Sequence, residues 1–469
     1  MSTKNKSVNT LFLACFLIPI IYWVYLFFAS QPEIVHDAAG YQILGKNLMK
    51  NGFKHYFTTG PNREPVYPFL VASSMQWGKL LSVSYMLPLK IFQLLLLFIT
   101  QLLSFKILQK AGVKPLITGL TVLYMGISPA MVNSALSVYS EIAAYPFILG
   151  IILITATFWS GRNTLRVRQS FLLGIILAVL FLLITLTKGA YEIIFYIYLL
   201  PFLLLAFFIQ GNKKFFSRLA VFLFTFATLF QTAIISYKFL NYEHNNQFTL
   251  TDRASWALYG SIARRVEKLT PQRLMTAIAY IPGEGFCNSV FGEEACYFWG
   301  IETLDSLALS KFMAVNNTHP SHEVNAVMKK ESLLKLKENP LQFFLLMPID
   351  GLKMFFWEST RMGFVTYPKW LGNLFTFTPF KNGIRLIVSL LTLFATCYLF
   401  FFVIKNWSDV FTHKHKDRPT HIYLFILLIS CSHVGLYSLF DTIPRFALPV
   451  APLFLLTIAF AADKLIARD

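Results

Sequence analysis

The residues of this sequence best suited to chemistry are acids and bases at the ends of long apolar segments. An ionisable side chain beside a lipid bilayer is costly and by default marks a site. A carboxylate there can act as a general base toward a hydroxyl or an amine. Arg and Lys can bind a phosphate and stabilise the charge that develops as a bond breaks. The set comprises Asp37, Arg63, Glu64, Glu141, Lys188, Glu192, Asp441 and Arg445.

The segments that must position these residues read as membrane-spanning helices. Hydrophobic residues make up 56% of the 469-residue chain and charged residues 14%, which is too apolar for a soluble globule of this length. A membrane β-barrel would show alternating apolar and polar residues instead. Because apolar stretches of about 20 residues recur, we predict an all-α polytopic membrane protein with a bundle of about 10–12 transmembrane helices.

Ten apolar stretches each fit one crossing of the membrane. The stretch at residues 10–30 is too long for a signal peptide and bulky near its end, so we expect it to be retained. Residues 341–359 are also apolar, but one crossing there would invert the later loops. We expect a re-entrant or interface-lying helix there, or half of a hairpin. The ten predicted spans are 10–30, 87–109, 115–133, 141–160, 170–187, 190–210, 216–238, 384–405, 421–440 and 445–463.

The distribution of positive charge predicts the topology. A net charge of +18 could suggest nucleic-acid binding, but Lys and Arg gather in short loops between apolar segments, which is the positive-inside pattern. We therefore exclude nucleic acid as a partner and place both termini in the cytoplasm. The loops predicted to be cytoplasmic are 106–114, 162–168, 213–218 and 405–421.

The same topology places the acids and bases on one side of the membrane. We interpret residues 1–469 as a single membrane domain, with 31–86 as the first extracytoplasmic loop and 239–340 as an extracytoplasmic cap loop. The corners at 134–141, 188–190 and 441–446 face the same side. A shared extracytoplasmic cavity is the prediction, and interfacial anchoring by snorkelling is the alternative.

The first loop begins with a predicted interface helix. Tyr41, Leu44 and Leu48 recur at helical spacing, as in an amphipathic helix that lies on a membrane. Gly52 suits the end of that helix, and a Pro-rich return to the bilayer follows. This arrangement would hold Asp37 at the membrane surface, with N-capping as the alternative role for Asp37.

Three motifs stand in order along the chain. They are "HDAAGYQILGKNLMKNG" followed by "REPVYPFLVA", then "SVYSEIAAYPF", and finally "DTIPRFALPVAPLFLL". Together they resemble the GT-C superfamily of membrane glycosyltransferases, in the branch of protein O-mannosyltransferases and lipid A aminoarabinose transferases. The first is similar to that branch's Asp-x-x-x-Tyr helix and Arg/Lys-x-Pro-x-Tyr-Pro turn, the second to its Ser-Glu corner, and the third to the start of its last helix.

The resemblance implies a GT-C-like fold and a polyprenyl-phosphate sugar as donor, used by a hexosyl- or pentosyltransferase. The acceptor stays open between lipopolysaccharide, another cell-surface glycan and protein. The site would face the extracytoplasmic side of a bacterial inner membrane. The roles that the resemblance implies are catalysis by Asp37 and Glu141, donor-phosphate binding by Arg445, Lys188 and Arg63, and lining of the substrate cavity by Tyr41, Tyr67 and Asp441.

The sequence departs from the family at three positions and leaves metal binding open. Ala38 follows Asp37 where many members carry an Asp-Glu pair, and Lys188 stands where the family often has Arg. Lys can bind phosphate only as a point charge. The final corner often has Glu shortly before the Arg, whereas here Asp441 lies four residues before Arg445. No cofactor is predicted, although the family leaves a divalent metal ion near Asp37 open. His319 and His322 in "THPSHE" are a weak metal candidate, because such spacing is common by chance.

Two other classes of protein compete with this interpretation. A flippase for lipid-linked sugars would also have many helices and a charged cavity, but it should show paired halves and charges near the middle of the membrane. An O-antigen-type ligase would not depend on Asp37. A phosphoethanolamine transferase would need a large soluble domain, and we find none in the sequence.

The five cysteines fall into two groups. Cys287 and Cys296 flank "NSVFGEEA" in the cap loop, and an extracytoplasmic location would permit a disulfide between them. Cys15, Cys397 and Cys431 lie in apolar helices, where we expect inert core thiols.

Overall fold

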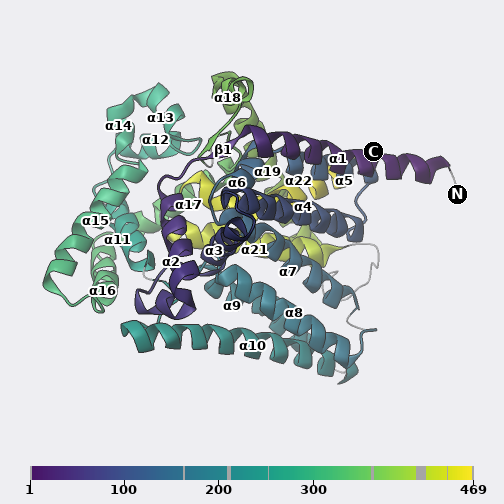
Figure 1. Ribbon diagram of the computed structural model, residues 1–469, viewed down its shortest axis with the longest axis horizontal. Coiled ribbons are helices and arrows are strands. Elements are labelled where there is room, and N and C mark those ends of the chain that lie inside the picture. The colour runs from purple at the N-terminus through teal and green to yellow at the C-terminus, as the bar shows by residue number, and fades with distance from the viewer. Residues whose placement is uncertain are drawn as a thin grey trace.

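The protein is a bundle of long helices with a group of shorter helices at one end. The computed structural model describes residues 3–161, 164–208, 213–251, 253–360, 364–407, 419–440 and 442–466. Asp441, a predicted site residue, lies outside the described residues. Figure 1 shows helices α11–α16 at one end of the bundle, and the two chain termini toward the opposite end.

The first part of the chain forms the long helices of one half of the bundle. Helix α10 packs along α8, and α7 packs between α4 and α8. These elements are α1 (Thr3–Ala29), β1 (Gln31–Pro32), α2 (Asp37–Thr58), α3 (Val66–Leu80), α4 (Met86–Lys110), α5 (Pro115–Ile127), α6 (Pro129–Leu136), α7 (Glu141–Gly161), α8 (Val167–Thr185), α9 (Tyr191–Phe208) and α10 (Lys213–Asn245).

The short helices that follow form a cap. In the cap, α11 packs on both α15 and α16, and it also contacts α17. The elements from here to the last short helix are α11 (Arg253–Val266), α12 (Pro271–Ala279), α13 (Glu284–Phe291), α14 (Glu293–Tyr297), α15 (Ile301–Thr318), α16 (Val324–Leu336), α17 (Pro340–Lys353), η1 (Met354–Phe356), β2 (Val365–Thr366) and α18 (Lys369–Thr376).

The chain then returns to the bundle and completes its centre. The last elements are α19 (Thr378–Lys405), α21 (Thr420–Leu439), η2 (Pro444–Val450) and α22 (Ala451–Ile466). Helix α22 packs against α19, and both α7 and the η2–α22 segment are mostly buried inside the bundle. The two-residue strands β1 and β2 pair in antiparallel fashion, Gln31 with Thr366 and Pro32 with Val365.

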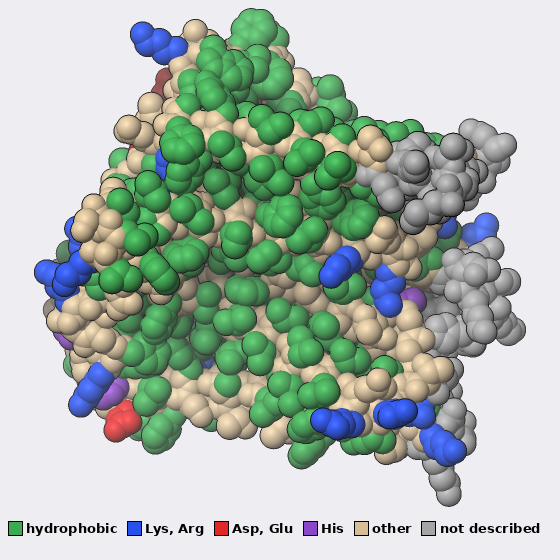
Figure 2. Space-filling model, turned by 45° about the vertical axis from the view of Figure 1, so that its right-hand side comes forward, with side chains coloured by type: hydrophobic (Ala, Val, Ile, Leu, Met, Phe, Trp, Pro, Cys, Tyr) green, Lys and Arg blue, Asp and Glu red, His purple; other side chains and the backbone are tan. Residues whose placement is uncertain are grey.

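The structure confirms an all-α polytopic membrane protein. Within the described part of the chain, eight helices are long and apolar enough to cross a membrane. They are α1, α4, α7, α8, α10, α19, α21 and the η2–α22 segment. In Figure 2, hydrophobic side chains cover the middle of the visible face, and Lys and Arg lie mainly toward its edges.

Two of the ten predicted spans differ from single crossings. Residues 115–133 lie in α5 and α6, which are bent by 46° relative to each other, and the apolar part of α9 whose side chains are described covers Tyr191–Leu204. The described residues therefore contain eight spans, or nine if α5 and α6 count as one. The ten predicted spans thus correspond to eight single helices, one bent pair and the described apolar part of α9, and the bend shows that a continuous apolar stretch does not reveal where a helix breaks.

The bend between α5 and α6 has a local cause and a distant one. Pro129 cannot continue the preceding helix, and the Ser128 side chain caps α6 by accepting from the Met131 N–H. Glu358 lies fully buried at the same break. Its carboxylate accepts from the Ser128 hydroxyl at 2.7 Å and from the Ala130 N–H at 2.9 Å, and burial raises the pKa of Glu358. The bend between α5 and α6 is therefore stabilised both by its own residues and by a buried carboxylate from a distant segment.

Helix α17 confirms that residues 341–359 do not cross the membrane as one helix. It has 14 residues, fewer than the ~20 that a crossing requires, and it is followed by the 3₁₀ turn η1. It packs against α11 of the cap and α21 of the bundle. This segment therefore connects the cap to the spanning helices.

Helix α2 is interrupted where the sequence predicted its end. Gly52 has φ 73° and ψ −177° inside the helix, a conformation that glycine adopts without strain, and the chain then resumes helical geometry up to Thr58. At the other end, His36 occupies the N-cap position without a side-chain capping bond, and Asp37 is the first helical residue.

Candidate functional site

Five charged side chains from five segments meet at one end of the bundle. Asp37 begins α2, Glu141 begins α7, and Arg445 lies in η2. Arg63 comes from the Pro-rich return of the first loop, and Lys188 from the link between α8 and α9. We call these five residues the charged cluster. All five were predicted site residues, and the structure brings them together.

The charged cluster is a continuous chain of ion pairs. Asp37 binds Arg63 Nη2 through Oδ1 and Arg445 Nη2 through Oδ2, each at 2.6 Å. Glu141 Oε1 lies 3.2 Å from Lys188 Nζ and 3.7 Å from Arg445 Nε. Arg445 therefore links the two carboxylates, and either carboxylate can influence where its guanidinium lies.

The charge balance of the cluster favours an anion. Three cations face two carboxylates, which leaves a net charge of +1 when all five are ionised. Burial alone would lower the pKa of Lys188, but the neighbouring Glu141 outweighs it and the pKa is raised. Burial likewise opposes the charge on Arg63, but Tyr41 and Asp37 raise its pKa. The positive charges therefore persist across the physiological pH range.

Accessibility distinguishes the two carboxylates. The Asp37 side chain is 24% exposed, whereas Glu141 is 3% exposed. Within the described residues, Glu141 Oε2 is buried without a hydrogen-bond partner. Asp37 is consequently the carboxylate that a ligand can reach. Glu141 is buried and influences the charged cluster through its contacts with Lys188 and Arg445.

Aromatic rings hold the two guanidinium groups in place. The Arg63 guanidinium lies 4.9 Å from the centre of the Tyr41 ring, and that of Arg445 lies 4.6 Å from the centre of the Tyr139 ring. Such cation–π contacts orient a charged group without neutralising it. The Tyr41 hydroxyl also lies 2.9 Å from Ser140 Oγ, which connects α2 to the corner before Glu141.

Tyr67 lies deeper than its predicted place on a cavity wall. It is fully buried, and its hydroxyl donates to Gln93 Oε1 at 2.6 Å. The Gln93 amide donates in turn to the carbonyl oxygens of Ala135 and Ser137, both at 2.9 Å. Tyr67 therefore supports the corner that carries Glu141.

The remaining predicted acids lie outside the charged cluster. Glu64 accepts the Gly189 N–H at 2.7 Å and so fixes the link that carries Lys188. Glu192 pairs with Lys238 at 2.5 Å. Sequence reasoning missed Tyr139 and Gln93. Tyr139 stands in the same motif as Glu141 and could have been found there, whereas Gln93 lies mid-helix with no local signal.

The charged cluster does not fit a divalent cation. Both carboxylates are already paired with cations, and a metal ion would add positive charge beside three positive groups. In the cap, His319 and His322 each lie within 4 Å of Glu323 on an exposed turn. Among the residues that the structure describes, no group of three or more His, Cys, Asp or Glu side chains could hold a metal ion.

A second set of charges joins the cap to the bundle. Arg265 Nε donates to Asp350 Oδ2 at 2.7 Å, and Lys353 Nζ lies 2.5 Å from Asp350 Oδ1. Arg265 also donates to the Phe440 carbonyl at 2.9 Å, and Arg264 donates to the Trp299 carbonyl at 3.1 Å. We call Arg264, Arg265, Asp350 and Lys353 the cap cluster. Sequence reasoning missed it because its members come from separate segments, Arg264 and Arg265 from the polar cap loop and Asp350 and Lys353 from the apolar stretch 341–359.

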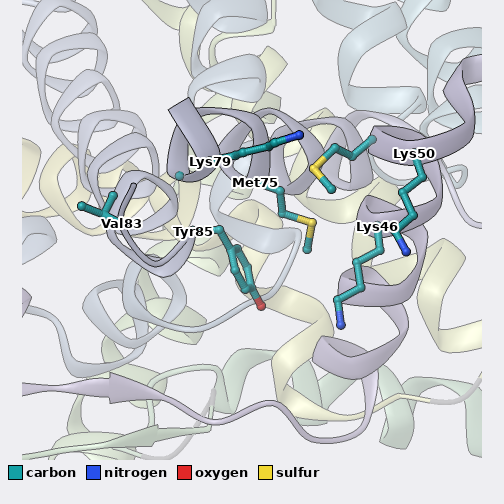
Figure 3. Close-up of a pocket in the computed structure, with 8 residues that line it drawn as sticks. Lys46, Lys50, Met75, Lys79, Val83 and Tyr85 are labelled. Atoms are coloured by element: carbon teal, nitrogen blue, oxygen red, sulfur yellow. The ribbon is translucent and has the colours of Figure 1, made fainter. Parts of the chain in front are cut away.

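A pocket of about 350 Å³ lies between α2 and α3. Lys46, Lys50 and Lys79 stand around it together with Met75 and Tyr85 (Figure 3). Lys46 is nine residues beyond Asp37 on α2, which is about 14 Å along a helix. We call it the lysine pocket. Its charge suits an anion, and it is separate from the charged cluster.

The cysteines of the cap form a disulfide, whereas those of the bundle are free thiols. Cys287 and Cys296 form the predicted disulfide, with Cα atoms 5.9 Å apart, and join α13 to α14. Cys15 is buried as expected. The prediction of core thiols was wrong for Cys397 and Cys431, which are exposed because they lie on outward faces of α19 and α21.

Comparison with known proteins shows similarity at the level of solved structures. No protein-family model and no curated protein matches the chain. Among solved structures, the chain is similar to the archaeal oligosaccharyltransferase AglB from Archaeoglobus fulgidus, in complex with an inhibitory peptide and a dolichol-phosphate. The match has 14% identity and a TM-score of 0.49, and covers 100% of this chain and 51% of that one. The chain thus spans about half the length of AglB, and the function must be argued from the site.

Proposed function

We propose that this protein is a glycosyltransferase that moves a sugar from a polyprenyl-phosphate donor to an acceptor at the extracytoplasmic face of the membrane. The observation that carries the proposal is the charged cluster, in which a reachable carboxylate lies between two guanidinium groups. A net positive cluster suits a lipid phosphate, and a carboxylate beside it suits the activation of an acceptor.

The proposed reaction is a single displacement at the anomeric carbon. The acceptor oxygen or nitrogen forms a bond to that carbon while the bond from the carbon to the phosphate oxygen breaks. Asp37 takes the proton of the acceptor, and polyprenyl phosphate leaves on Arg445, with Lys188 and Arg63 assisting. Because attack and departure occur on opposite sides, the anomeric configuration inverts.

The ion pairs imply an order of events. Both oxygens of Asp37 are bound to guanidinium groups, which reduces the ability of this carboxylate to accept a proton. The phosphodiester of the donor, a monoanion, competes for the same guanidinium groups, often with two parallel hydrogen bonds. We propose that donor binding draws Arg445 toward the phosphate and thereby releases Asp37 Oδ2, so that the base becomes active only when donor is present.

The surroundings of the cluster suit a lipid-linked donor. The segment η2, which carries Arg445, leads directly into α22. An apolar groove of about 740 Å³ runs between α22, α5 and α19, with Ile387 and Leu455 among its lining residues. An apolar surface on spanning helices provides contacts for a hydrocarbon chain, while the phosphate would lie at the end of the bundle.

Topology supports the extracytoplasmic side for this reaction. The cap helices stand at the end of the bundle opposite the chain termini (Figure 1). Lys and Arg in the loops at 106–114 and 213–218 favour a cytoplasmic location for those loops. Cysteine-accessibility labelling should find residues 31–86 and 239–340 outside. Labelling of these loops from the cytoplasm would contradict the assignment.

The decisive experiment is transfer in vitro. The purified protein in lipid nanodiscs is supplied with defined polyprenyl-phosphate sugars and with extracted surface glycans, glycolipids or peptides. Mass spectrometry should detect an acceptor heavier by one sugar and released polyprenyl phosphate. A flippase would instead move the donor across proteoliposomes without altering it, and that result would replace the proposal.

A further inference from the structure

A polar pocket lies where the first loop, the end of α10 and the cap meet. Its volume is about 420 Å³, within the ~300–1,000 Å³ of small-molecule sites. One wall is the turn at Gly60, and another comes from the residues that end and follow α10. The cap helices α15 and α16 and the turn between them complete it. We call it the amide pocket, since Asn245, Asn246, Gln247, Asn316 and Asn325 line it.

The chemistry of the amide pocket differs from that of both charged sites. Within the described residues, no Lys, Arg, Asp or Glu lines it, and its polar groups are the five amides together with Ser321, His244 and His322. A side-chain amide offers two donors and an acceptor in one plane, which matches adjacent hydroxyl groups on a sugar ring. Half-buried Phe312 adds an apolar surface for the C–H face of such a ring.

Some of the amides are held by the protein and others are available. Asn245 Nδ2 donates to the Phe57 carbonyl, and Asn325 Nδ2 donates to Gln247 Oε1, both at 2.8 Å. These bonds fix the orientation of the amides and leave Asn245 Oδ1 and Gln247 Nε2 for another partner. In the described part of the chain, no protein hydrogen bond involves the side chains of Asn246 and Asn316. A pre-oriented polar pocket with unused donors and acceptors suits a ligand rich in hydroxyls.

The amide pocket is adjacent to the charged cluster. Pro61 lines the pocket, and Arg63, two residues later, binds Asp37. Two residues of extended chain span at most ~7 Å. The turn is internally fixed, because the Tyr56 hydroxyl donates to the Arg63 carbonyl and Asn62 Nδ2 donates to the Tyr56 carbonyl at 2.7 Å. A sugar chain bound in the pocket can therefore extend to Asp37.

We propose that the amide pocket is a carbohydrate subsite that binds a neutral sugar residue of the acceptor, beyond the residue that receives the transferred sugar. This inference rests on the proposed function and makes its acceptor a glycan. The lysine pocket does not compete for this role, because three cations around a small opening favour an anionic ligand. Binding to the amide pocket positions the acceptor hydroxyl at Asp37 and does not take part in breaking the donor bond.

The test measures glycan binding without donor. The full-length protein in detergent micelles is applied to an array of neutral oligosaccharides, and the glycans that bind are titrated by native mass spectrometry. The variant carries Asn246→Ala and Asn316→Ala, which remove two amides that make no side-chain hydrogen bond within the described residues. Because Asn246 has φ 55°, a conformation that Ala tolerates less well than Asn, thermal unfolding of the variant is measured alongside binding. The control carries Asn51→Ala and Asn317→Ala, which are exposed and outside the pocket.

We expect the Asn246→Ala/Asn316→Ala variant to bind its glycan about tenfold more weakly, as the loss of two neutral hydrogen bonds would give. The control should bind like the unchanged protein. In a transfer assay, the same variant should raise the acceptor KM and leave kcat nearly unchanged. Equal binding by the variant and the unchanged protein, or no binding of any neutral glycan, would reject the subsite.

Binding and transfer separate the two proposals. If neutral glycans bind in the amide pocket but no sugar is transferred from any polyprenyl-phosphate donor, the subsite stands and the proposed function fails. If transfer occurs and the Asn246→Ala/Asn316→Ala variant has the same acceptor KM as the control, the proposed function stands and the subsite fails.

Discussion

The charged cluster and the cap cluster use the same residue types at similar distances but in opposite environments. Asp37 pairs with two guanidinium groups and remains 24% exposed. Asp350 pairs with Arg265 and Lys353 and is 2% exposed. A buried ion pair fixes structure, and its loss leaves an uncompensated charge. A pair that solvent and ligands can reach is able to exchange partners. The exposed fraction of the carboxylate, and not the presence of an ion pair, therefore distinguishes a candidate binding site from a purely structural contact.

The largest effect should follow from removing the reachable carboxylate. Asp37→Asn keeps the size of the side chain but cannot accept the acceptor proton, and a positioned base is worth about 10²- to 10⁴-fold in rate. We expect transfer at saturating donor and acceptor to fall by that factor while the protein folds and reaches the membrane. The matched control is Glu302→Gln, the same type of change on an exposed part of the cap. Transfer by Asp37→Asn close to that of the unchanged protein would remove Asp37 as the base and make Glu141 the next candidate.

The matching change in the cap cluster should affect stability. Asp350→Asn leaves Arg265 and Lys353 buried beside a neutral group, and breaking a buried pair commonly costs about 3–5 kcal/mol. We expect a lower thermal midpoint and faster proteolysis within residues 253–340. If Asp350→Asn has the same thermal midpoint as the unchanged protein while Asp37→Asn unfolds at a much lower temperature, the roles assigned to the two clusters are reversed.

The cap cluster should also respond to acid in a defined direction. Burial by itself raises the pKa of Asp350, but Lys353, Arg265 and Arg264 outweigh it and hold the pKa below its ordinary range. A carboxyl whose pKa is lower in the folded state contributes stability above its unfolded pKa of about 3.9. That stability is lost as pH falls through the folded pKa. Protease resistance of the cap should therefore persist from pH 7 to pH 5 and decline only in stronger acid. A loss of resistance already between pH 7 and pH 5 would contradict the assignment.

A smaller effect is expected for the proposed phosphate contact. Arg445→Gln removes a charge-assisted hydrogen bond, which is worth about 1.5–3 kcal/mol, or roughly ten- to a hundredfold in donor affinity. The measurement is the donor KM with a defined polyprenyl-phosphate sugar. Arg273→Gln, in an exposed pair with Glu267, is the control. An unchanged donor KM in Arg445→Gln would show that the phosphate binds elsewhere, and the lysine pocket would be tested next.

The smallest effect should come from an exposed pair of the same length. Lys335 and Glu338 lie 2.6 Å apart, the distance of the pairs at Asp37, but their side chains are 32% and 53% exposed. Lys335→Gln should change the free energy of unfolding by at most about 0.5 kcal/mol, since exposed helix pairs contribute little. A larger decrease in the free energy of unfolding, measured by thermal unfolding, would mean that distance and not exposure determines the strength of these pairs. That result would contradict the distinction drawn between the charged cluster and the cap cluster.

The sequence revealed the charged cluster because its residues interrupt apolar surroundings. Asp37, Glu141, Lys188 and Arg445 stand out against spanning helices, where an ionisable group has few harmless explanations. In the cap cluster, Arg265 comes from a polar loop and Asp350 from the apolar stretch 341–359, whose topology the sequence left open, and no motif linked the two residues. The same contrast explains why the sequence did not indicate the amide pocket, whose Asn and Gln residues come from segments far apart in the chain.

The helical architecture was predictable from apolar length, whereas its details depend on distant contacts. A run of about 20 apolar residues predicts a membrane crossing, but it does not show that the helix breaks at Ser128, between α5 and α6. That break involves Glu358, which lies 230 residues away in the sequence and accepts the Ser128 hydroxyl. Similarly, the outward faces that carry Cys397 and Cys431 depend on which helices pack beside α19 and α21, and a single helix does not encode its neighbours.

The bond between Asp37 and Arg445 joins residues 408 positions apart. During synthesis, Asp37 is translated 408 residues before Arg445 exists to pair with it. Through that interval the first loop carries its carboxylate without its final partner, and helix α7 is inserted with Glu141 at its leading end. The charged cluster can therefore form only after Arg445 has been translated, so under the proposed function a chain that lacks η2 would be unable to bind the donor phosphate at this cluster.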